Sequence, residues 1–328
     1  MVGLGVIGAG RAGALHVTAA NKVEGVRYVG VAEVDDDRRA AFVARHGGAS
    51  FRDYRDLLAN DAVQLVVVAL PHHLHADVTV DAARAGKNVL VEKPMATSLE
   101  ECDRMIAAAR QSGVFLHIGQ TYHFHPTTAE ARRVMEGGEI GEVVMGLEVL
   151  HSARHPGSQP SWIMTAAGGG GQLFSNGIHQ VDRALWLVES RPVSVRAQVG
   201  THFFAGEIDV DDASHMWIAF ENGATVSILT TGFRAGAPSF FGEYVGNAGM
   251  LRVDQELRVA SGAERAYRTV PVEAAEFSDG FVRQLDAVAR AIERGGPAPV
   301  SGEWGREVLA VLLAAVESSR SGREVALA

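Results

Sequence analysis

Short apolar runs alternate with amphipathic stretches along the first third of the chain, and this alternation predicts strands and helices in turn. The run Val2–Ile7 is almost wholly apolar, as expected of a strand buried on both faces of a parallel sheet. Further strands are predicted at 26–33, 49–51, 64–70, 88–91 and 115–118, and helices at 14–21, 36–46, 54–59, 75–85 and 98–110. Ser98 and Glu101 have the spacing of a capping box at the start of the last helix. Repeated β-α units of this kind predict a doubly wound parallel sheet over residues 1–120.

The pattern changes after about residue 120, where strand-like stretches follow one another. They are predicted at 142–153, 193–204, 214–220, 224–233, 244–253 and 268–272, and two helices are predicted at about 279–294 and 305–320. Asn222-Gly223 lies between two of these strands, as in a tight hairpin turn. We therefore expect an antiparallel meander in a second domain over residues 121–328, with the closing helices packing back on the first domain.

Composition and charge restrict the class of protein. The chain has 328 residues, 47% hydrophobic and 21% charged, which is ordinary for a globular protein of about two domains. A net charge of −9 argues against a nucleic acid or an anionic membrane surface as partner. Cys102 is the only cysteine, which excludes an intramolecular disulfide and a zinc site of clustered thiolates. With no apolar run near the ~20 residues of a membrane span and no basic, signal-like start, a cytoplasmic location is expected.

A glycine-rich motif follows the first predicted strand and opens the first predicted helix. In Gly8-x-Gly10-x-x-Gly13 the first two glycines permit a tight turn and close approach of a pyrophosphate, and the third permits close packing of helix on strand. The helix N-terminus stabilises the phosphate charge. An ordinary glycine-rich turn is the alternative, and the strand-turn-helix context argues against it. A dinucleotide is therefore expected at Gly8, Gly10, Arg11, Ala12 and Gly13.

An acidic residue ends the second predicted strand at the position expected for a ribose contact. Glu33 lies about 20 residues beyond Gly13, where a carboxylate commonly binds the ribose hydroxyls. Its charge would repel a 2′-phosphate, and no basic residue follows it directly. NAD is therefore favoured over NADP, although Arg38 leaves NADP as the alternative.

Two further motifs indicate what the cofactor is used for. Glu92-Lys93-Pro94 follows a predicted strand at its carboxyl end, where open α/β sheets bind ligands, and Pro94 restricts Lys93 to an extended conformation. A surface lysine at a strand–loop junction is the alternative for an isolated motif of this kind. A flexible glycine run, 168–171, leads into a helix that carries His179 and Asp182 on adjacent faces. A glycine linker followed by a structural His–Asp pair is the alternative there.

The ordered set of motifs resembles the glucose-fructose oxidoreductase/inositol dehydrogenase/MocA (GFO/IDH/MocA) family over nearly the whole chain. The set comprises the glycine motif, a strand ending near Leu70-Pro71 with a following His75, the segment Gly86-Lys87-Asn88-Val89, Glu92-Lys93-Pro94, and Gly177-x-His179-x-x-Asp182. The resemblance implies an α/β protein with an N-terminal Rossmann domain and a C-terminal domain with a large open, predominantly antiparallel sheet. It also implies a homodimer or homotetramer formed through that sheet. Leu70, Pro71, His75, Glu92 and Lys93 are then expected at the cofactor.

The resemblance further implies hydride transfer between NAD and a hydroxyl carbon of a sugar, inositol or related polyol. Under this hypothesis His179 takes the hydroxyl proton, since an imidazole pKa of ~6.5 suits a base near neutrality. Lys93 stabilises the developing alkoxide charge. Ser175 and Asn176 are expected to orient the substrate, and His123 and Trp162 to line its pocket.

Three positions depart from the family pattern. Ser175 stands where an Asp is common, His123 where an Arg is common, and Ile163 where an Arg often follows the Trp. His123 and Ile163 suggest a substrate pocket unlike that of a typical polyol enzyme, so a cis-dihydrodiol dehydrogenase of the same family stays open as an alternative. Because serine cannot replace a carboxylate as a base, a catalytically weak NAD-binding regulator or sensor stays open as well.

Histidines are frequent enough for a metal site to be weighed. If His123 and His125 alternate on a strand, both rings face one side. No carboxylate falls at a familiar ligand spacing, and hydride transfer needs no metal. No metal site is therefore predicted.

Overall fold

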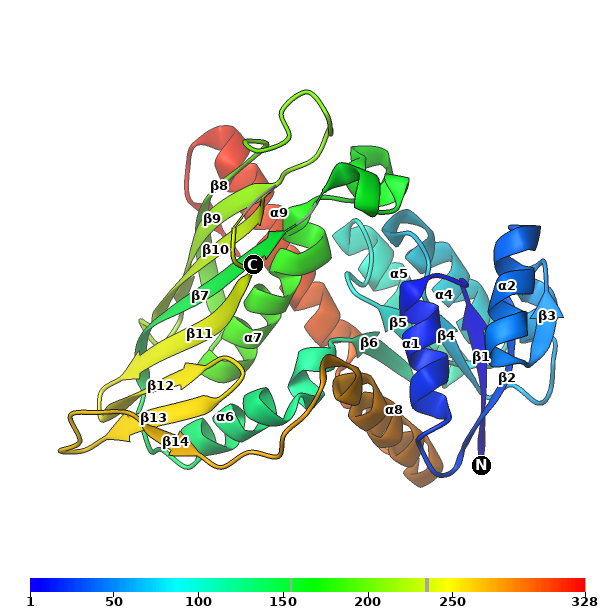
Figure 1. The fold of residues 1–328 in the computed structure, drawn as a ribbon, viewed down its shortest axis with the longest axis horizontal. Coiled ribbons are helices and arrows are strands. Elements are labelled where there is room, and N and C mark those ends of the chain that lie inside the picture. Colours follow the sequence, from blue (N-terminus) through cyan, green and yellow to red (C-terminus); the bar gives the residue numbers. More distant parts are fainter. Residues whose placement is uncertain (154, 234–235, 328) are drawn as a thin grey trace. The chain divides into compact units, whose positions relative to one another are not determined.

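A computed structural model describes residues 1–153, 155–233 and 236–327. The chain divides into two compact units, of which the first comprises residues 1–124 with 275–306 and the second 125–274 with 307–328. Helix α8 (Phe277–Arg294) belongs to the first unit, and helix α9 (Gly302–Ser321) contributes residues to both. The first unit is therefore built from two segments that lie far apart in the sequence (Figure 1).

The first unit contains the parallel sheet that the sequence predicts. Its six strands have the order β3-β2-β1-β4-β5-β6, and each neighbouring pair is parallel. The strands are β1 (Val2–Ile7), β2 (Val26–Ala32), β3 (Ala49–Phe51), β4 (Leu65–Val68), β5 (Asn88–Glu92) and β6 (Leu116–Gly119). The strand order reverses between β1 and β4, and ligands of such sheets bind outside the carboxyl ends of the strands at that point.

Helices cover this sheet, and one of them begins at the capping box expected from the sequence. They are α1 (Arg11–Ala20), α2 (Asp36–His46), α3 (Tyr54–Leu58), α4 (His75–Arg84), α5 (Leu99–Ser112) and α8. Ser98 accepts a hydrogen bond from the Glu101 N–H and the Glu101 carboxylate accepts one in return, so the predicted capping box of α5 is confirmed. Val17 of α1 packs in one apolar core with Phe281 and Leu285 of α8 and the strands beneath. Helix α8 thus completes the core of a sheet whose last strand ends more than 150 residues before it.

The second unit contains a nine-stranded sheet of order β14-β13-β12-β11-β7-β10-β9-β8-β15. The strands are β7 (Val143–Ala153), β8 (Pro192–Gly200), β9 (Ala213–Phe220), β10 (Thr225–Phe233), β11 (Ser239–Gly246), β12 (Gly249–Val253), β13 (Leu257–Ser261), β14 (Arg268–Val270) and β15 (Val325–Ala326). All neighbouring pairs are antiparallel except β7 with β10, so the predicted predominantly antiparallel sheet is confirmed.

The expectation of an uninterrupted meander is wrong in this sheet. Strand β7 lies between β11 and β10 and runs parallel to β10, with Met145 opposite Thr225. The reason is that helix α7 (Ile178–Val188) follows β7 and carries the chain across the sheet to β8. Strands β8, β9 and β10 then follow as antiparallel neighbours, and β10 ends beside β7. The Asn222-Gly223 turn joins β9 to β10.

Two other local predictions are wrong. The stretch 244–253 is not one strand, because it holds the end of β11 and all of β12, which pair as a hairpin around Asn247-Ala248. His123 and His125 do not share a strand: His123 lies in the 3₁₀ turn η2 (Thr121–Phe124), and His125 precedes helix α6 (Pro126–Glu136). Pro126 explains the second difference, since proline is favoured at the first position of a helix.

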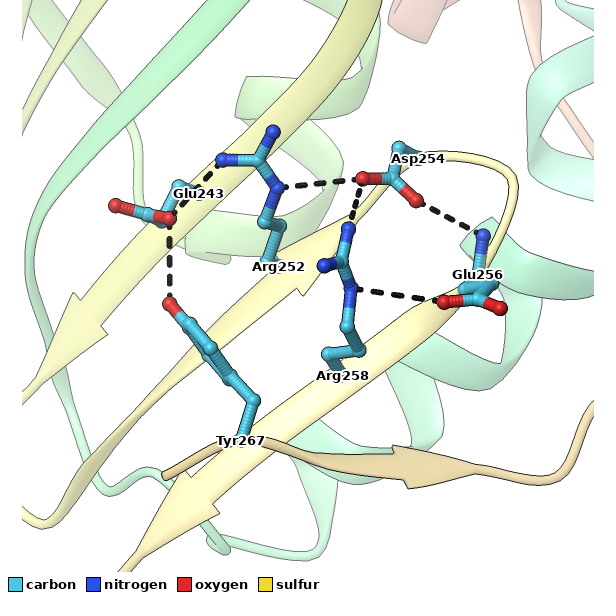
Figure 2. A network of polar contacts seen from close by, with 6 residues as sticks. All are labelled: Glu243, Arg252, Asp254, Glu256, Arg258 and Tyr267. Carbon is cyan, nitrogen blue, oxygen red and sulfur yellow. Dashed lines mark hydrogen bonds and ion pairs between the residues drawn. The ribbon is translucent and has the colours of Figure 1, made fainter. Parts of the chain in front are cut away.

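Polar contacts across β11, β12 and β13 stabilise one end of the second sheet (Figure 2). Arg252 lies opposite Glu243 on the neighbouring strand, with 3.4 Å between Nη1 and Oε2, and its Nε donates to Asp254 Oδ2 at 3.2 Å. The Tyr267 hydroxyl donates to Glu243 as well. Opposite charges on facing strand positions add modest stability.

Candidate functional site

The glycine loop between β1 and α1 is shaped by two of its three glycines. Gly8 has φ +105°, and a Cβ at this position would lie 2.2 Å from the Ala69 carbonyl oxygen. A Cβ on Gly13 would lie 2.2 Å from the Gly8 carbonyl oxygen. A Cβ on Gly10 would meet no atom of the described residues within 4 Å. The protein itself therefore requires Gly8 and Gly13, whereas Gly10 leaves open the space in which a pyrophosphate would approach the backbone.

Glu33 follows β2 and is fixed against this loop. Its Oε2 accepts the Ala9 N–H at 3.1 Å, and its Oε1 accepts the Asp35 N–H at 3.1 Å. The carboxylate borders a pocket of about 760 Å³, whose lining includes Ile7, Ala32, Val34, Leu70 and Leu74. This arrangement fits the ribose-binding role that the sequence predicts for Glu33.

The arginines that follow Glu33 are engaged by carboxylates. Arg38 lies 3.6 Å from Glu33 and 3.5 Å from Asp35, and Arg39 pairs with Asp36 at 2.5 Å. Guanidinium groups already shared with carboxylates are poorly suited to bind a 2′-phosphate. The residues that directly follow Glu33 therefore fit NAD.

Lys93 lies in the loop after β5, and the residue before it is anchored from the interior. Nε2 of His16, on α1, lies 2.7 Å from Oε1 of Glu92, and the His16 side chain is wholly buried. Burial raises the pKa of Glu92, but the hydrogen bond and charge of His16, together with the charge of Lys93, outweigh it and leave this pKa below its ordinary value. Glu92 is thus an ionised carboxylate beside Lys93. The peptide bond between Lys93 and Pro94 is cis.

His75 begins α4, as predicted, and lies in the interior of the first unit. Its Nδ1 is 2.9 Å from the Pro94 carbonyl oxygen and its Nε2 is 2.8 Å from the Leu70 carbonyl oxygen. Burial lowers the pKa of His75 below its ordinary value, against the opposing effects of the two carbonyl groups and of Glu92. Because the ring is enclosed, it lies between the two loops that carry these carbonyl groups and not at the protein surface. Pro71 follows Leu70 and caps the short turn η1 (His72–Leu74).

His123 lies in turn η2 of the first unit, where its ring packs edge-on against Trp304 at 5.7 Å between centroids. It is largely buried. The fully buried His117 lies nearby in the sequence, and burial lowers its pKa to about 3. His117 is therefore neutral at physiological pH and accepts the Val300 N–H at 3.1 Å.

The remaining predicted residues lie in the second unit around the start of α7. His179 is in the first turn of α7 and is half-buried, and Asp182 lies one turn later and is fully buried. Ser175 and Asn176 lie in the preceding π-helical turn η6 (Leu173–Gly177). The structure therefore brings Ser175, Asn176 and His179 together on one continuous helical segment.

The glycine run before α7 is closely packed, which corrects the prediction of a flexible segment. A Cβ on Gly168 would lie 2.2 Å from the Trp162 carbonyl oxygen, and one on Gly170 would lie 2.0 Å from that of Ile163. These glycines therefore allow the chain that carries Trp162 to lie directly against the run that leads to His179.

An acidic segment that the sequence analysis missed fixes the same region. Asp211 Oδ2 accepts the Leu173 N–H at 2.8 Å, and Asp209 Oδ1 accepts the Ala166 N–H at 2.8 Å. Asp212 accepts three backbone N–H groups, those of His202, Phe203 and Phe204. The run Asp209-Val210-Asp211-Asp212 was the available signal, since short acidic side chains often bind free backbone N–H groups.

A buried ion pair holds α7 on the sheet. Arg183 donates to both carboxylate oxygens of Glu148 on β7, at 2.9 and 2.6 Å, and the Tyr244 hydroxyl donates to Glu148 at 2.5 Å. The Phe240 ring lies 4.4 Å below the guanidinium carbon. Burial and the Glu148 charge raise the pKa of Tyr244 well above its ordinary value, so that it remains a donor. The helix that carries His179 is thereby tied to the centre of the second sheet.

Within residues 1–153, 155–233 and 236–327, no cluster of three or more His, Cys, Asp or Glu side chains could hold a metal ion. None of the helices in this described part is long and apolar enough to cross a membrane.

Two family models match the chain. The family described as "Oxidoreductase family, NAD-binding Rossmann fold" (GFO/IDH/MocA) matches residues 2–120, and the GFO/IDH/MocA C-terminal domain matches residues 128–252.

Individual proteins are also similar to this chain. Inositol 2-dehydrogenase 2 of Saccharopolyspora erythraea is 32% identical over 228 residues, which is 69% of this chain and 65% of that protein. The matched part thus spans slightly less than two thirds of that relative. The scyllo-inositol 2-dehydrogenase (NAD(+)) of Bacillus subtilis is 27% identical over 98% of this chain and 95% of its own. A solved structure of levoglucosan dehydrogenase with NADH and levoglucosan has a TM-score of 0.92 at 26% identity, covering 99% of each chain.

Proposed function

Because the chain belongs to the GFO/IDH/MocA family of NAD-binding oxidoreductases, we propose that it transfers a hydride between NAD and a hydroxyl carbon of a sugar, inositol or related polyol. The observation that carries the proposal is Lys93 at the carboxyl end of β5. Its neighbours Glu92 and Pro94 are anchored by His16 and His75, beside the strand end that carries Leu70. An anchored lysine at this edge is what hydride transfer from an alcohol requires, since charge develops on the alcohol oxygen.

The first unit holds the cofactor in this proposal. The backbone around Gly8, Gly10 and Gly13, with Arg11 and Ala12 at the start of α1, binds the pyrophosphate, and Glu33 accepts hydrogen bonds from ribose hydroxyls. When bound, NAD supplies the carbon that accepts the hydride. The alternative cofactor NADP is disfavoured by the fixed Glu33 carboxylate, which would lie close to a 2′-phosphate.

Lys93 and His179 act on the substrate hydroxyl. His179 takes the proton, because a neutral imidazole is a general base suited to proton transfer near neutrality. The Lys93 ammonium donates a hydrogen bond to the same oxygen and stabilises its negative charge as the hydride leaves. The proposal requires that both nitrogens reach one substrate oxygen in the working enzyme.

A polyol suits the remaining candidate side chains. Trp162 offers an apolar face for the C–H groups of a ring, and Ser175, Asn176 and His123 can each hydrogen-bond a hydroxyl group. Support for a sugar or inositol also comes from the names of the relatives, which are inositol and levoglucosan dehydrogenases. We further propose a cytoplasmic homodimer or homotetramer formed through the second sheet, which light scattering of the purified protein would test.

A substrate panel tests the proposed function. Purified protein is mixed with NAD and, separately, with sugars, anhydrosugars, inositols and cis-dihydrodiols, and NADH is followed by its absorbance. Formation of NADH with a polyol supports the proposal, whereas NADH from dihydrodiols alone would favour the dihydrodiol dehydrogenase. If no compound reacts while NAD still binds, the regulator hypothesis replaces the enzyme.

A further inference from the structure

The residues on both sides of Lys93 are each contacted by a buried histidine, Glu92 at its carboxylate and Pro94 at its carbonyl group. We propose that His75 and His16 are positioning residues for Lys93, His75 through the carbonyl group of Pro94 and His16 through the carboxylate of Glu92. The inference rests on the proposed function, because it concerns the amine that this function places at the reacting hydroxyl.

His75 ties the residue after Lys93 to the start of helix α4. Its Nδ1 contacts the Pro94 carbonyl oxygen at 2.9 Å and its Nε2 contacts the Leu70 carbonyl oxygen at 2.8 Å. The ring is fully buried, so neither carbonyl group can exchange this contact for bulk water without loss. A neutral imidazole carries one N–H group, and in the Nδ1–H tautomer the ring donates it to Pro94 and holds that carbonyl group.

His16 ties the residue before Lys93 to helix α1. Its Nε2 lies 2.7 Å from the Glu92 carboxylate, and its ring meets the Phe281 ring of α8 edge-on at 5.1 Å between centroids. Among the described residues, Nδ1 of His16 has no hydrogen-bond partner. The polar contact of this ring is therefore directed wholly at Glu92.

The His75 and His16 contacts attach the two sequence neighbours of Lys93 to different helices. Pro94 is attached by His75 to the start of α4, and the Glu92 side chain is attached by His16 to α1. Lys93 lies between these two anchored residues, which restricts the positions that its amine can take. Placement of this kind matters, since a shift of about 1 Å in a catalytic group can reduce the rate by about 100-fold.

The composition of the chain makes the position of Lys93 measurable without a substrate. Lys22, Lys87 and Lys93 are the only lysines. Lys22 is exposed and serves as the internal reference, while Lys87 donates hydrogen bonds to the carbonyl groups of Asn60 and Val63. Acetylation by sulfosuccinimidyl acetate is followed at each lysine by mass spectrometry of peptides, with and without NADH. At NADH about ten times its dissociation constant, an amine beside the nicotinamide should react about tenfold more slowly.

Replacement of each histidine by Asn or by Gln distinguishes the contribution of Nδ1 from that of Nε2. The amide nitrogen of Asn takes the place of Nδ1 and that of Gln takes the place of Nε2, so His75→Asn keeps the Pro94 contact and His75→Gln keeps only the Leu70 contact. At position 16 the order is reversed, because His16→Gln keeps the Glu92 contact and His16→Asn loses it. We expect about tenfold protection of Lys93 in His75→Asn and His16→Gln, and less than about twofold in His75→Gln and His16→Asn. Melting temperature and NADH affinity are measured for all four variants.

This crossed pattern cannot arise from a general loss of stability, because Asn is the functional replacement at one position and Gln at the other. If one variant does not melt cooperatively, the pair at the other position decides. Protection in His75→Gln and His16→Asn equal to that of the unmodified protein would overturn the positioning role and leave the proposed function intact. If NADH does not protect Lys93 in the unmodified protein, the proposed placement of Lys93 fails, and this inference fails with it.

Discussion

Arg183 on α7 and Glu148 on β7 form a two-point hydrogen-bonded ion pair, with both side chains at most 1% exposed. Removal of one partner leaves a buried charge without its counterion, which costs about 3–5 kcal/mol in buried pairs. We therefore expect Glu148→Gln to lower the free energy of unfolding by an amount of this order, measured by urea denaturation. The double variant Glu148→Leu with Arg183→Met should cost less than the single change, since it removes both charges. A cost below about 1 kcal/mol for Glu148→Gln would contradict the assigned role.

Replacement of Lys93 or His179 by alanine should lower turnover by about 100-fold or more and leave NAD affinity nearly unchanged, because the interactions lost are made mainly in the transition state. The measurement is steady-state kinetics with a compound identified in the substrate panel. Lys22→Ala is the matched control, since Lys22 is an exposed lysine of the same unit. Near-normal turnover in both active-site variants would remove the catalytic assignment.

Two glycines of one loop should respond differently to the same methyl group. Gly10→Ala places a Cβ in open space, so the melting temperature should stay unchanged while NADH affinity falls by about tenfold or more. Gly13→Ala places a Cβ 2.2 Å from the Gly8 carbonyl oxygen, which should lower stability by about 2 kcal/mol. Calorimetry and NADH fluorescence titration measure the two effects. Unimpaired NADH binding by Gly10→Ala would argue against this loop as the pyrophosphate site.

Cys102 should be unreactive in the folded protein. Its side chain is buried in α5, and burial raises its pKa to about 12, so almost no thiolate exists at pH 8. A disulfide reagent at pH 8 should therefore label no thiol until a denaturant is added, and one thiol per chain afterwards. Rapid labelling without denaturant would show that α5 opens readily.

Glu92 should contribute to stability in a pH-dependent way. Its pKa in the folded chain lies below the ordinary value of 4.5, so its stabilising effect is complete above that value and is lost as the pH falls through the lower folded pKa. The difference in melting temperature between the unmodified protein and Glu92→Gln should therefore shrink as the pH is lowered from 6 to about 3. A difference that is independent of pH would show that His16 does not stabilise the charged form of Glu92.

Local signals in the sequence were sufficient for the first sheet. The apolar runs of β1, β4 and β5 gave the buried strands, and the bounds of α2 agree with Asp36–His46 because Asp35 and Gly47 mark its two ends. The position of β7 beside β10 was not predictable in this way. It depends on the return of the chain after α7, which no short window of residues contains.

In the candidate site, too, the residues of a local motif were predictable from the sequence, whereas contacts between distant residues were not. Gly8, Gly10, Gly13 and Glu33 follow from a motif within one β-α-β unit. The contacts of His16 with Glu92 and of Asp211 with Leu173 join residues 76 and 38 positions apart, and neither residue type at either place indicates its partner. The packing of the glycine run on Trp162 and Ile163 likewise depends on backbone proximity that composition does not encode.

Because α8 supplies Phe281, Leu285 and Val288 to the core of the first unit, residues 1–124 emerge from the ribosome without the surface that covers α1. The dinucleotide-binding half then lacks the Phe281 ring that packs on His16 of α1 until the segment 125–274 and α8 itself have been synthesised. A fragment ending near residue 124 would accordingly be expected to aggregate, and expression of the nucleotide-binding half by itself would need the residues of α8 joined to it.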